Sequence, residues 1–533
     1  MKGSQTILFR VDGSVATGTG HVMRCLALAQ AWQDVGGKAV FAMAEGTSAL
    51  RDRLLADSCQ VLGISAEPGT RKDAGQTAAL AGEQHAEWIV VDGYRFSAEY
   101  QCALRAAGYK VLFIDDCGQA GRYSAHLVLN QNVGATESLY QNRDVHTRLL
   151  LGPRYCLLRR EFNGWRDYVR EIPPAGHRVL ITLGGSDSEN LTARMLRAAA
   201  SVKVENLEVT VVLGGSNPHF DSLQQTALKL AKQSAMKITL RKDVANMGEL
   251  MAWADVAISA AGSTCWELCL LALPALLIDV AKNQTAVARE LHRLGCAIHL
   301  GGTREISIGR LGSELERMLG SWESRRNLSR QSRELVDGSG SQRVISVLRG
   351  GGDVYLRRVQ EEDSRLLWEW ANDPVVRSAS FSSAPIPWES HIAWFSGKLR
   401  EGKCFIWIAE DAEGIPFGQI RFEIRSDGDS EVGVSIAQAK RGQGLADRLI
   451  ALGVERFMRE HHCPRVHAFV KAANAASVRA FEKADFKRAE TMRVREEVTV
   501  HVILERTGTT DATLPLQPAE AFEVTGSVGP HVS

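Results

Sequence analysis

The segment from Asp12 to His21 combines glycines with a histidine between an expected strand, Ile7–Val11, and an expected helix that begins at Val22. Glycines at such a turn, here Gly18 and Gly20, let backbone amides approach a phosphate or a sugar. His21 stands at the helix entrance, where an imidazole of ordinary pKa, about 6.5, can exchange protons at neutral pH. Asp12 could orient that imidazole or cap the approach to the helix. The segment predicts a proton-transferring histidine beside a phosphate or sugar, with a capping or packing histidine as the alternative.

Similar polar turns follow several later strands. A carboxylate one turn into a helix can accept both hydroxyls of a ribose, and a glycine turn ahead of it offers amides to a diphosphate. Ordinary turns and caps are the alternative for each of them. Together they predict a nucleotide-sugar site made of Asp92, Tyr94, Gly185, Ser186, Gly262, Ser263, Thr264, Glu267, Asn283 and Gln284. Asp115 and Asp116 are weaker candidates at the same sheet edge.

A second glycine-led helix lies near residue 442, after the alternating strand Glu431–Ile436. Successive amides at such a helix start suit a pyrophosphate. Glu431 could accept an ammonium proton through water or could be a solvated strand carboxylate. The expected ligand contacts are Val434, Ile436, Arg441, Gly442, Gln443, Gly444, Leu445, Ala446, Asn474, Ser477 and Phe481.

Upstream of this helix lies a third polar group, Asn372, Arg377 and His391, among tryptophans that could simply be core residues.

These motifs must be held in place by strands and helices, and the hydrophobic pattern predicts where these elements lie. Up to about residue 340, short Val, Ile and Leu-rich runs alternate with helical periodicity, which is typical of parallel sheets with crossover helices. A chain of 533 residues also implies three to four packing units of about 150 residues. The expected strands are Ile7–Val11, Ala39–Met43, Trp88–Val91, Lys110–Ile114, Arg178–Leu183, Glu208–Leu213, Lys237–Leu240, Val256–Ser259 and Ala275–Ile278. The expected domains are two Rossmann-like halves, 1–160 and 161–347, a glycine-rich linker, 348–353, an α/β domain, 354–507, and a flexible tail, 508–533.

Composition narrows the function classes. Lys and Arg total 63 against 62 for Asp and Glu, a net charge of +1, so nucleic acid is not expected as a ligand. The ten cysteines form no CxxC pair or zinc spacing, which predicts buried thiols in a reducing compartment and no metal. With neither a signal-like segment nor an apolar run of membrane length, a cytoplasmic location without a membrane partner is expected.

Several segments in the first 345 residues together resemble a known family. They are Phe9–Asp12, Gly18–Cys25, Leu151–Tyr155, Gly184–Asp187, Gly262–Thr264 with Glu267, and Asn283–Gln284. It is the UDP-sugar hydrolase family of pseudaminic acid biosynthesis, related to MurG-like glycosyltransferases. The resemblance covers most of residues 5–345 and implies a GT-B pair of Rossmann-like domains. It also implies hydrolysis of UDP-2,4-diacetamido-2,4,6-trideoxy-β-L-altropyranose at its anomeric C–O bond. His21 would act as the base or orient the water, and amides and hydroxyls would hold the diphosphate without metal.

The spacing R-x-x-G-x-A from Arg441 to Ala446, with the segment Asn474–Phe486, resembles the acetyl-CoA site of GNAT N-acetyltransferases. Acetyl-CoA is therefore the expected co-substrate. Members of this family often have a tyrosine where Phe481 stands, to protonate the leaving thiolate, and phenylalanine has no proton to give. The segment from Trp370 to Trp394 resembles GNAT enzymes that acetylate nucleotide-linked amino sugars. This resemblance implies that Asn372, Arg377 and His391 contact the uridine diphosphate or the amino sugar.

The combined prediction is an α/β protein with a GT-B pair followed by a GNAT domain that performs two consecutive steps. The GNAT domain would acetylate UDP-4-amino-4,6-dideoxy-N-acetyl-β-L-altrosamine, and the GT-B pair would hydrolyse the product to free sugar and UDP. Three alternatives are a glycosyltransferase with an appended acyltransferase, a nucleotide-sugar or acyl-CoA sensor, and an acyltransferase that modifies a protein amine. The sequence makes no prediction of oligomeric state.

Overall fold

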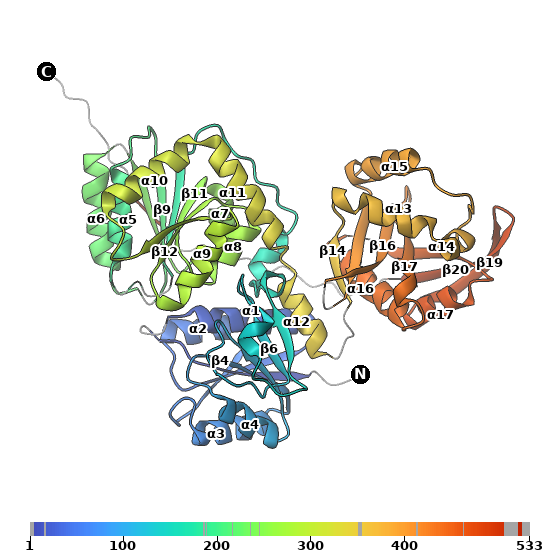
Figure 1. Ribbon diagram of the computed structural model, residues 1–533, viewed down its shortest axis with the longest axis horizontal. Helices are drawn as coiled ribbons and strands as arrows, with labels where there is room; N and C mark the ends of the chain where they lie inside the picture. Colours follow the sequence, from blue (N-terminus) through green and yellow to red (C-terminus); the bar gives the residue numbers. More distant parts are fainter. Residues whose placement is uncertain are drawn as a thin grey trace. The chain divides into compact units, whose positions relative to one another are not determined.

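The computed structural model describes residues 5–14, 18–184, 187, 189–215, 217–234, 236–244, 246–349, 354–411, 414–461, 463–505 and 521–524. The chain divides into two compact units, which we call unit 1 (residues 1–345 with 516–533) and unit 2 (residues 346–515) (Figure 1). The linker predicted at 348–353 and the tail predicted at 508–533 lie almost entirely outside the described residues.

Unit 1 begins with a seven-stranded parallel sheet in the order β3-β2-β1-β4-β5-β6-β7. Its central strands are continuous apolar runs buried on both faces, as expected for a parallel sheet that helices cover on both sides. Thr47, Thr70 and Ser97 cap the helices α2, α3 and α4 through their side chains. The elements are β1 (Thr6–Val11), α1 (Gly20–Asp34), β2 (Lys38–Met43), α2 (Ser48–Ala56), β3 (Gln60–Gly63), α3 (Arg71–Glu83), β4 (Ala86–Asp92), α4 (Ala98–Ala106), β5 (Lys110–Ile114), β6 (Leu127–Asn130), η1 (Glu137–Tyr140), β7 (Arg148–Leu151), η2 (Pro153–Tyr155) and η3 (Arg160–Trp165).

The second sheet of unit 1 has the order β13-β12-β11-β8-β9-β10-β21, parallel except for the antiparallel pairing of β21 with β10. Its first six strands follow the doubly wound order 3-2-1-4-5-6. The elements are β8 (Arg178–Thr182), α5 (Leu191–Ala200), β9 (Glu208–Leu213), α6 (Phe220–Gln233), β10 (Lys237–Lys242), α7 (Met247–Trp253), β11 (Val256–Ala260), α8 (Thr264–Leu270), β12 (Ala275–Asp279), η4 (Lys282–Gln284), α9 (Thr285–Arg293), β13 (Ile298–Gly302), α10 (Ile308–Gly320), α11 (Trp322–Leu335), α12 (Gly340–Leu348) and β21 (Ala521–Val524).

Unit 2 is built on a mostly antiparallel sheet in the order β14-β15-β16-β17-β18-β20-β19, in which β17 and β18 are parallel. Helices α16 and α17 pack on one face over a core that includes Trp407, Phe422 and Phe457. The elements are β14 (Tyr355–Arg358), η5 (Glu361–Asp363), α13 (Ser364–Asn372), α14 (Pro374–Ala379), α15 (Trp388–Arg400), β15 (Cys404–Glu410), β16 (Pro416–Ile424), β17 (Ser430–Ile436), η6 (Gln438–Lys440), α16 (Leu445–Glu460), β18 (Arg465–Lys471), α17 (Ala475–Lys483), β19 (Lys487–Val494) and β20 (Glu497–Glu505).

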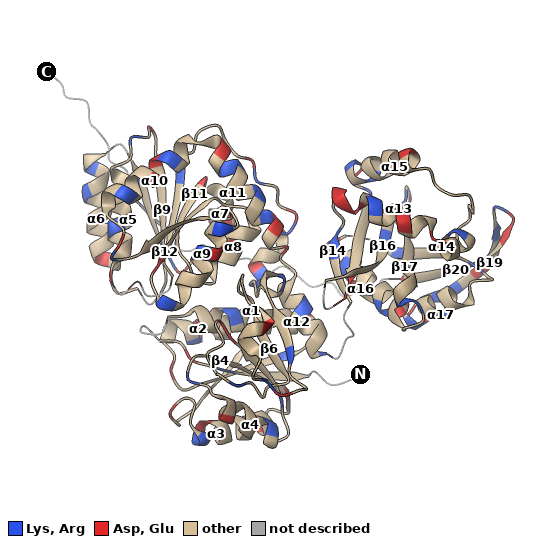
Figure 2. Cartoon of the chain, in the orientation of Figure 1, with Lys and Arg blue, Asp and Glu red and all other residues tan. Residues whose placement is uncertain are grey.

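All nine strands expected in unit 1 are present within one or two residues of their predicted ends. Five further short strands, β3, β6, β7, β13 and β21, were not predicted. Lys and Arg are interspersed with Asp and Glu on the helices of both units, in keeping with the balanced charge (Figure 2).

Candidate active sites

A cavity of about 1010 Å³ in unit 1 lies at the carboxyl ends of the strands of both its sheets. This is the position at which doubly wound sheets bind ligands, beyond the point where the strand order reverses. Both halves supply lining residues, so the cavity is a shared site. The predicted residues that line it are Gly18, Gly20, His21, Tyr94, Gly262, Ser263, Thr264, Glu267, Asn283 and Gln284.

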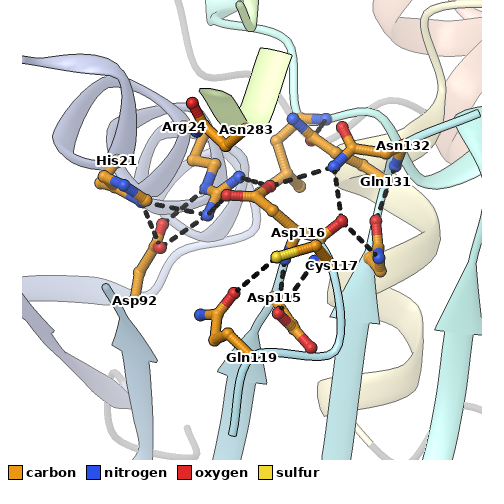
Figure 3. A network of polar contacts seen from close by, with 12 residues as sticks. His21, Arg24, Asp92, Asp115, Asp116, Cys117, Gln119, Gln131, Asn132 and Asn283 are labelled. Carbon is orange, nitrogen blue, oxygen red and sulfur yellow. Dashed lines mark hydrogen bonds and ion pairs between the residues drawn. The ribbon is translucent and has the colours of Figure 1, made fainter. Parts of the chain in front are cut away.

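His21, in the first turn of α1, is held by a carboxylate at the end of β4. Its Nδ1 lies 2.7 Å from Oδ1 of Asp92 (Figure 3). Because an ionised carboxylate only accepts hydrogen bonds, Nδ1 carries a proton toward Asp92, and Nε2 is the ring nitrogen left to accept one. His21 is among the residues that line the cavity. The imidazole is therefore arranged to accept a proton in the cavity.

Arg24 lies one helical turn after His21 and binds two carboxylates. Its Nε and Nη2 donate to Asp92 at 2.6 and 2.7 Å, and its Nη1 donates to Asp116 at 2.6 Å (Figure 3). Burial alone would raise the pKa of Asp92, but the charges of Arg24 and His21 hold that pKa well below its ordinary value. The pKa of Asp116 is lowered as well, because the charge of Arg24 outweighs the effect of burial. Both carboxylates are thus ionised at neutral pH.

The prediction that Asp12 orients His21 is wrong. Oδ1 of Asp12 accepts hydrogen bonds from the backbone amides of Ala44 and Glu45, at 2.7 and 2.9 Å, and so caps the turn after β2. Its Oδ2 binds Arg10, a fully buried residue that also pairs with Asp73 on α3. Arg10 and Asp12 therefore brace the sheet beside the cavity, and Asp92 takes the role predicted for Asp12.

One hydrogen bond across the cavity joins the two halves. Nδ2 of Asn283 donates to the hydroxyl of Tyr94 at 2.5 Å, and that hydroxyl donates to Asp116 at 2.9 Å. The ring of Tyr94 meets His21 edge-on at a centroid distance of 5.0 Å. Burial and the charge of Asp116 raise the pKa of Tyr94, so its hydroxyl stays protonated. Tyr94 and Asn283 thus place polar groups from both halves next to His21.

Glu267 of α8, predicted to bind ribose hydroxyls, is held by Arg159. Nη2 of Arg159 lies 2.9 Å from Glu267 and 3.1 Å from Glu161, at the start of η3. Glu267 lines the cavity together with Arg159. The carboxylate is thus fixed at the cavity wall.

The glycine turns come close to each other across the cavity. A Cβ atom at Gly20 would lie 3.8 Å from Oγ of Ser263, and Gly18 has a positive φ of 79°. α1 begins after Thr19 without a side-chain cap, so its first amides remain available to an anion. Gly185 and Ser186 lie outside the described residues. Among the residues that are described, no group of three His, Cys, Asp or Glu side chains could hold a metal ion, and metal independence stays a prediction.

In unit 2, strands β17 and β18 pair over two residues and then separate. The paired positions are Ser430 with Val466 and Glu431 with His467, although β17 continues for five residues more and β18 for four. The predicted contacts Val434 and Ile436 lie on the part of β17 beyond this pairing, and Glu431 is exposed at its start. We call this opening between the strands the splay.

The glycine-led helix start is present as predicted at α16. Gly442 and Gly444 have positive φ of 76° and 69°, and residues 442–444 are exposed. Leu445 and Ala446 pack partly against the core at the start of the helix. The helix has no side-chain cap, as an anion site at its first amides requires.

Other side chains predicted to touch acetyl-CoA have protein partners. Arg441 donates to the carbonyl of Ile436 and pairs with Asp373 at 2.8 Å. Gln443 donates to the carbonyl of Ala439, and Asn474 accepts from the amide of Ser477 as the cap of α17.

Phe481 was predicted to contact acetyl-CoA, but its side chain lies in the protein core. Its side chain is 2% exposed and packs against Phe486 in the core under α17, with ring centroids 5.1 Å apart. The ring of Phe481 is therefore part of the hydrophobic core.

The three predicted amino-sugar contacts are also turned toward the protein. Asn372 donates to the carbonyls of Trp368 and Ile386 and accepts from the amide of Ile386, and Arg377 donates to Ala384 and Ser380. The prediction is wrong for His391, which is 3% exposed and bonded to the carbonyl of Ser364. Asn372 and Arg377 instead hold the loop before α15 against α13 and α14.

Sequence reasoning missed Arg24 and gave Asp116 little weight. The spacing of His21 and Arg24, three residues apart on an expected helix, was an available signal because it places both on one helix face. Asp92 and Asp116 also follow neighbouring strands, β4 and β5, whose ends meet at one edge.

Two family models match the chain. The glycosyltransferase family 28 C-terminal domain matches residues 178–342, and the acetyltransferase (GNAT) domain matches residues 353–487. With the topology described above, these matches confirm the predicted fold class, a GT-B pair of Rossmann-like domains followed by a GNAT α/β domain. No helix in the described parts of the chain is both long and apolar enough to cross a membrane.

Three curated proteins are similar in sequence. An uncharacterized protein of Methanocaldococcus jannaschii is 22% identical over 91% of this chain and 97% of its own. The spore coat polysaccharide biosynthesis protein SpsG of Bacillus subtilis is 29% identical over 47% of this chain and 70% of its own. The UDP-2,4-diacetamido-2,4,6-trideoxy-β-L-altropyranose hydrolase of Campylobacter jejuni is 27% identical over 54% of this chain and 97% of its own. The Campylobacter jejuni relative confirms the resemblance to the pseudaminic acid pathway hydrolase, and the chain also contains the GNAT domain at residues 353–487.

Proposed function

We propose that this protein is a bifunctional enzyme that acetylates a UDP-linked amino sugar and then hydrolyses the acetylated UDP-sugar. The amino sugar is UDP-4-amino-4,6-dideoxy-N-acetyl-β-L-altrosamine, and the final products are free 2,4-diacetamido-2,4,6-trideoxy-L-altrose and UDP. The name of the Campylobacter jejuni relative supports the second substrate, and the GNAT domain supports the first step. The observation that carries the proposal is the imidazole of His21, fixed by Asp92 in a cavity that both Rossmann-like halves line.

In the hydrolytic step, water attacks the anomeric carbon and the bond from that carbon to the diphosphate oxygen breaks. Nε2 of His21 takes a proton from the water, and the electron pair of the broken C–O bond leaves with UDP. Asp92 stabilises the imidazolium ion that forms, and Arg24 keeps that carboxylate ionised. Tyr94 and Asn283 line the cavity beside His21 and can orient the water or the sugar.

The nucleotide is bound mainly by the second half. The turn Gly262–Thr264 offers amides and hydroxyls to the diphosphate, and Gly185 and Ser186 are proposed to do the same. Glu267, held by Arg159, accepts the ribose hydroxyls. Since UDP is a good leaving group, orienting the water and holding the diphosphate charge account for most of the catalysis.

In the acetylation step, the amine nitrogen attacks the thioester carbonyl of acetyl-CoA and the C–S bond breaks. The ammonium form of the amine gives up two protons in total, and the departing thiolate takes up one. Glu431, exposed on β17 beside the splay, takes protons from the amine through water. The amides at the start of α16 bind the pyrophosphate of acetyl-CoA.

The test is time-resolved NMR of the UDP-4-amino sugar with acetyl-CoA, in the wild type and in the His21→Ala variant. We expect the wild type to release UDP and free sugar without any added acceptor, which separates hydrolysis from glycosyl transfer. The variant should accumulate the acetylated UDP-sugar and release UDP at least about 100-fold more slowly.

A His146→Ala variant is the matched control, because His146 is half-exposed in the same half of unit 1 and pairs loosely with Asp144 at 3.8 Å. It should release UDP at the wild-type rate. If the His21→Ala variant also keeps the wild-type rate, the role proposed for His21 is wrong. Binding of acetyl-CoA without transfer would instead favour a sensor.

A further inference from the structure

A row of titratable side chains crosses the sheet of unit 2 from the splay to the sheet edge. Nε2 of His467 on β18 lies 2.9 Å from Oδ2 of Asp429, and its Nδ1 lies 2.9 Å from Nε2 of His501 on β20. Nδ1 of His501 lies 3.6 Å from Oε1 of Glu490 on β19. Asp429, His467 and His501 are buried, whereas the side chain of Glu490 is 59% exposed. The row therefore runs from a buried carboxylate to one in contact with solvent.

The row lies on the sheet face opposite α16 and α17. The alternate residues Val466, Ala468, Val500 and Val502 belong to the core under those helices, so His467 and His501 point to the other face. His467 pairs in register with Glu431 at the last paired position before the splay opens. Asp429 precedes Glu431 by two residues. The buried end of the row thus lies beside the two paired positions from which the splay opens, and the proposed function puts the thioester of acetyl-CoA in the splay.

The hydrogen bonds give the row a direction. Asp429 is ion-paired with Arg465 at 3.0 Å, so it is ionised and accepts the proton on Nε2 of His467. When His467 carries only this proton, its Nδ1 accepts from Nε2 of His501. This leaves Nδ1 of His501 as a lone pair facing the carboxylate of Glu490, and among the described residues it has no hydrogen-bond partner. A proton that arrives at this nitrogen would shift one proton along each bond toward Asp429.

A second buried acceptor stands at the inner end of the row. Oδ1 of Asp429 has no hydrogen-bond partner in the described part of the chain, although Asp429 is 2% exposed. Buried carboxylate oxygens usually have partners, so one without a partner suggests an exchange site. Phe469 stacks on the ring of His501 at 4.5 Å and holds it in line.

We propose that Glu490, His501, His467 and Asp429 conduct a proton from solvent to the thiolate that leaves acetyl-CoA. The inference rests on the proposed acetyltransferase function and supplies the proton that Phe481 cannot give. As the C–S bond breaks, the sulfur takes the proton carried by Asp429, directly or through one water. The row is refilled from solvent at Glu490. The amine loses two protons through Glu431, so one proton is released per turnover.

The charged groups around the row favour this direction. Burial lowers the pKa of His501, and the charges of His467 and Arg425 lower it further, while Glu490 raises it. His467 faces Asp429 and His501, and Arg465 faces Asp429 from the start of β18. The imidazole of His501 is therefore neutral at rest and holds an added proton only briefly.

The test measures acetyl transfer to the UDP-4-amino sugar by the full chain carrying His501→Gln or His501→Ala. We expect His501→Gln to lower kcat at least about tenfold with KM for acetyl-CoA unchanged, because an amide holds the hydrogen bond but cannot relay a proton. In His501→Ala, added imidazole should restore part of the rate, and more at pH 6 than at pH 8, since the imidazolium form donates. Glu490→Gln should lower kcat about threefold, whereas Glu482→Gln, a surface carboxylate on α17 paired with Arg488, should leave it unchanged.

Nitrogen NMR of labelled wild-type protein provides a readout apart from activity, with both His467 and His501 expected as Nε2–H tautomers at neutral pH. The inference is overturned by a His501→Gln variant within twofold of wild type, by better rescue at pH 8, or by the opposite tautomers. Acetyl-CoA binding and UDP release by each variant show that both units are folded. If the wild type itself transfers no acetyl group, the proposed acetyltransferase function is wrong. If the wild type is active and the variants transfer the acetyl group at the same rate, only the proposed proton path is wrong.

Discussion

Unit 1 and unit 2 each contain a histidine fixed by an aspartate that an arginine neutralises. In unit 1 the set is His21, Asp92 and Arg24, and in unit 2 it is His467, Asp429 and Arg465. The two sets differ at the second ring nitrogen, which is left for a ligand in the cavity-lining His21 but meets His501 in unit 2. Under the two proposals, a hydrogen bond to an aspartate thus prepares one imidazole to act on a ligand and the other to pass a proton onward.

The arginines differ as well. The side chain of Arg24 is 6% exposed and binds two buried carboxylates, whereas that of Arg465 is 51% exposed. Solvent can replace Arg465 but not Arg24. We therefore expect the set in unit 1 to be more sensitive to every substitution.

The largest difference is expected from removing the carboxylate charge. Asp92→Asn should lower UDP release on the order of 100- to 1000-fold, because the amide no longer stabilises the imidazolium of His21. Asp429→Asn should lower acetyl transfer about tenfold, because it affects a proton supplied through the row. Both rates are measured on each variant, and equal losses in the two reactions would contradict the distinction between a histidine that acts on a ligand and one that relays.

The next difference concerns stability. Arg24→Met leaves Asp92 and Asp116 as unpaired buried charges and should lower the free energy of unfolding of unit 1 by about 3 kcal/mol. Arg465→Met removes an exposed partner and should cost less than about 1 kcal/mol in unit 2. Chemical denaturation followed by hydrogen exchange in each unit measures both, and a larger loss for Arg465→Met would reverse the comparison.

The pH dependence of stability should also separate the two sets. The pKa of Asp92 is lower in the folded protein than its ordinary value of 3.8. Its stabilising contribution is therefore complete above that ordinary value and is lost as the pH falls toward the folded pKa. The free energy of unfolding of unit 1 should fall with acidification below about pH 4, and it should fall less steeply in Asp92→Asn. Parallel slopes for wild type and variant would show that Asp92 does not contribute.

The smallest effect on rate is expected at Phe481. Because its ring is buried in the core, Phe481→Tyr should change kcat for acetyl transfer less than about twofold and should destabilise unit 2 by about 1 kcal/mol, the cost of a buried hydroxyl. Kinetics and denaturation of this single variant test both effects. A large gain in rate would show that proton donation from this position limits the reaction and would weaken the case for the row.

The sequence was sufficient where the pattern was strong. Long apolar runs such as β1 and β4 predicted both parallel sheets, and the glycine spacings predicted the turns before α1 and α16. Short strands such as β6, four residues and all buried, lacked a pattern that separates strand from other buried chain.

The partners of charged side chains could not be predicted. Asp92 ends β4 and Asp12 directly follows β1, and only the register and the position of Arg10 decide which of them faces His21. His467 and His501 are 34 residues apart and meet because β18 and β20 are neighbours. Such contacts depend on strand order, which local sequence does not encode.

The hydrogen bond between Asn283 and Tyr94 has a consequence for the end of each catalytic cycle. Asn283 lies in η4, directly before α9, so a movement of η4 away from the first sheet would break this bond. Breaking it would also release the tyrosine hydroxyl, which contacts Asp116 beside the ring of His21. Under the proposed function, a widening of the cavity that breaks the bond would therefore change the surroundings of His21 as UDP leaves.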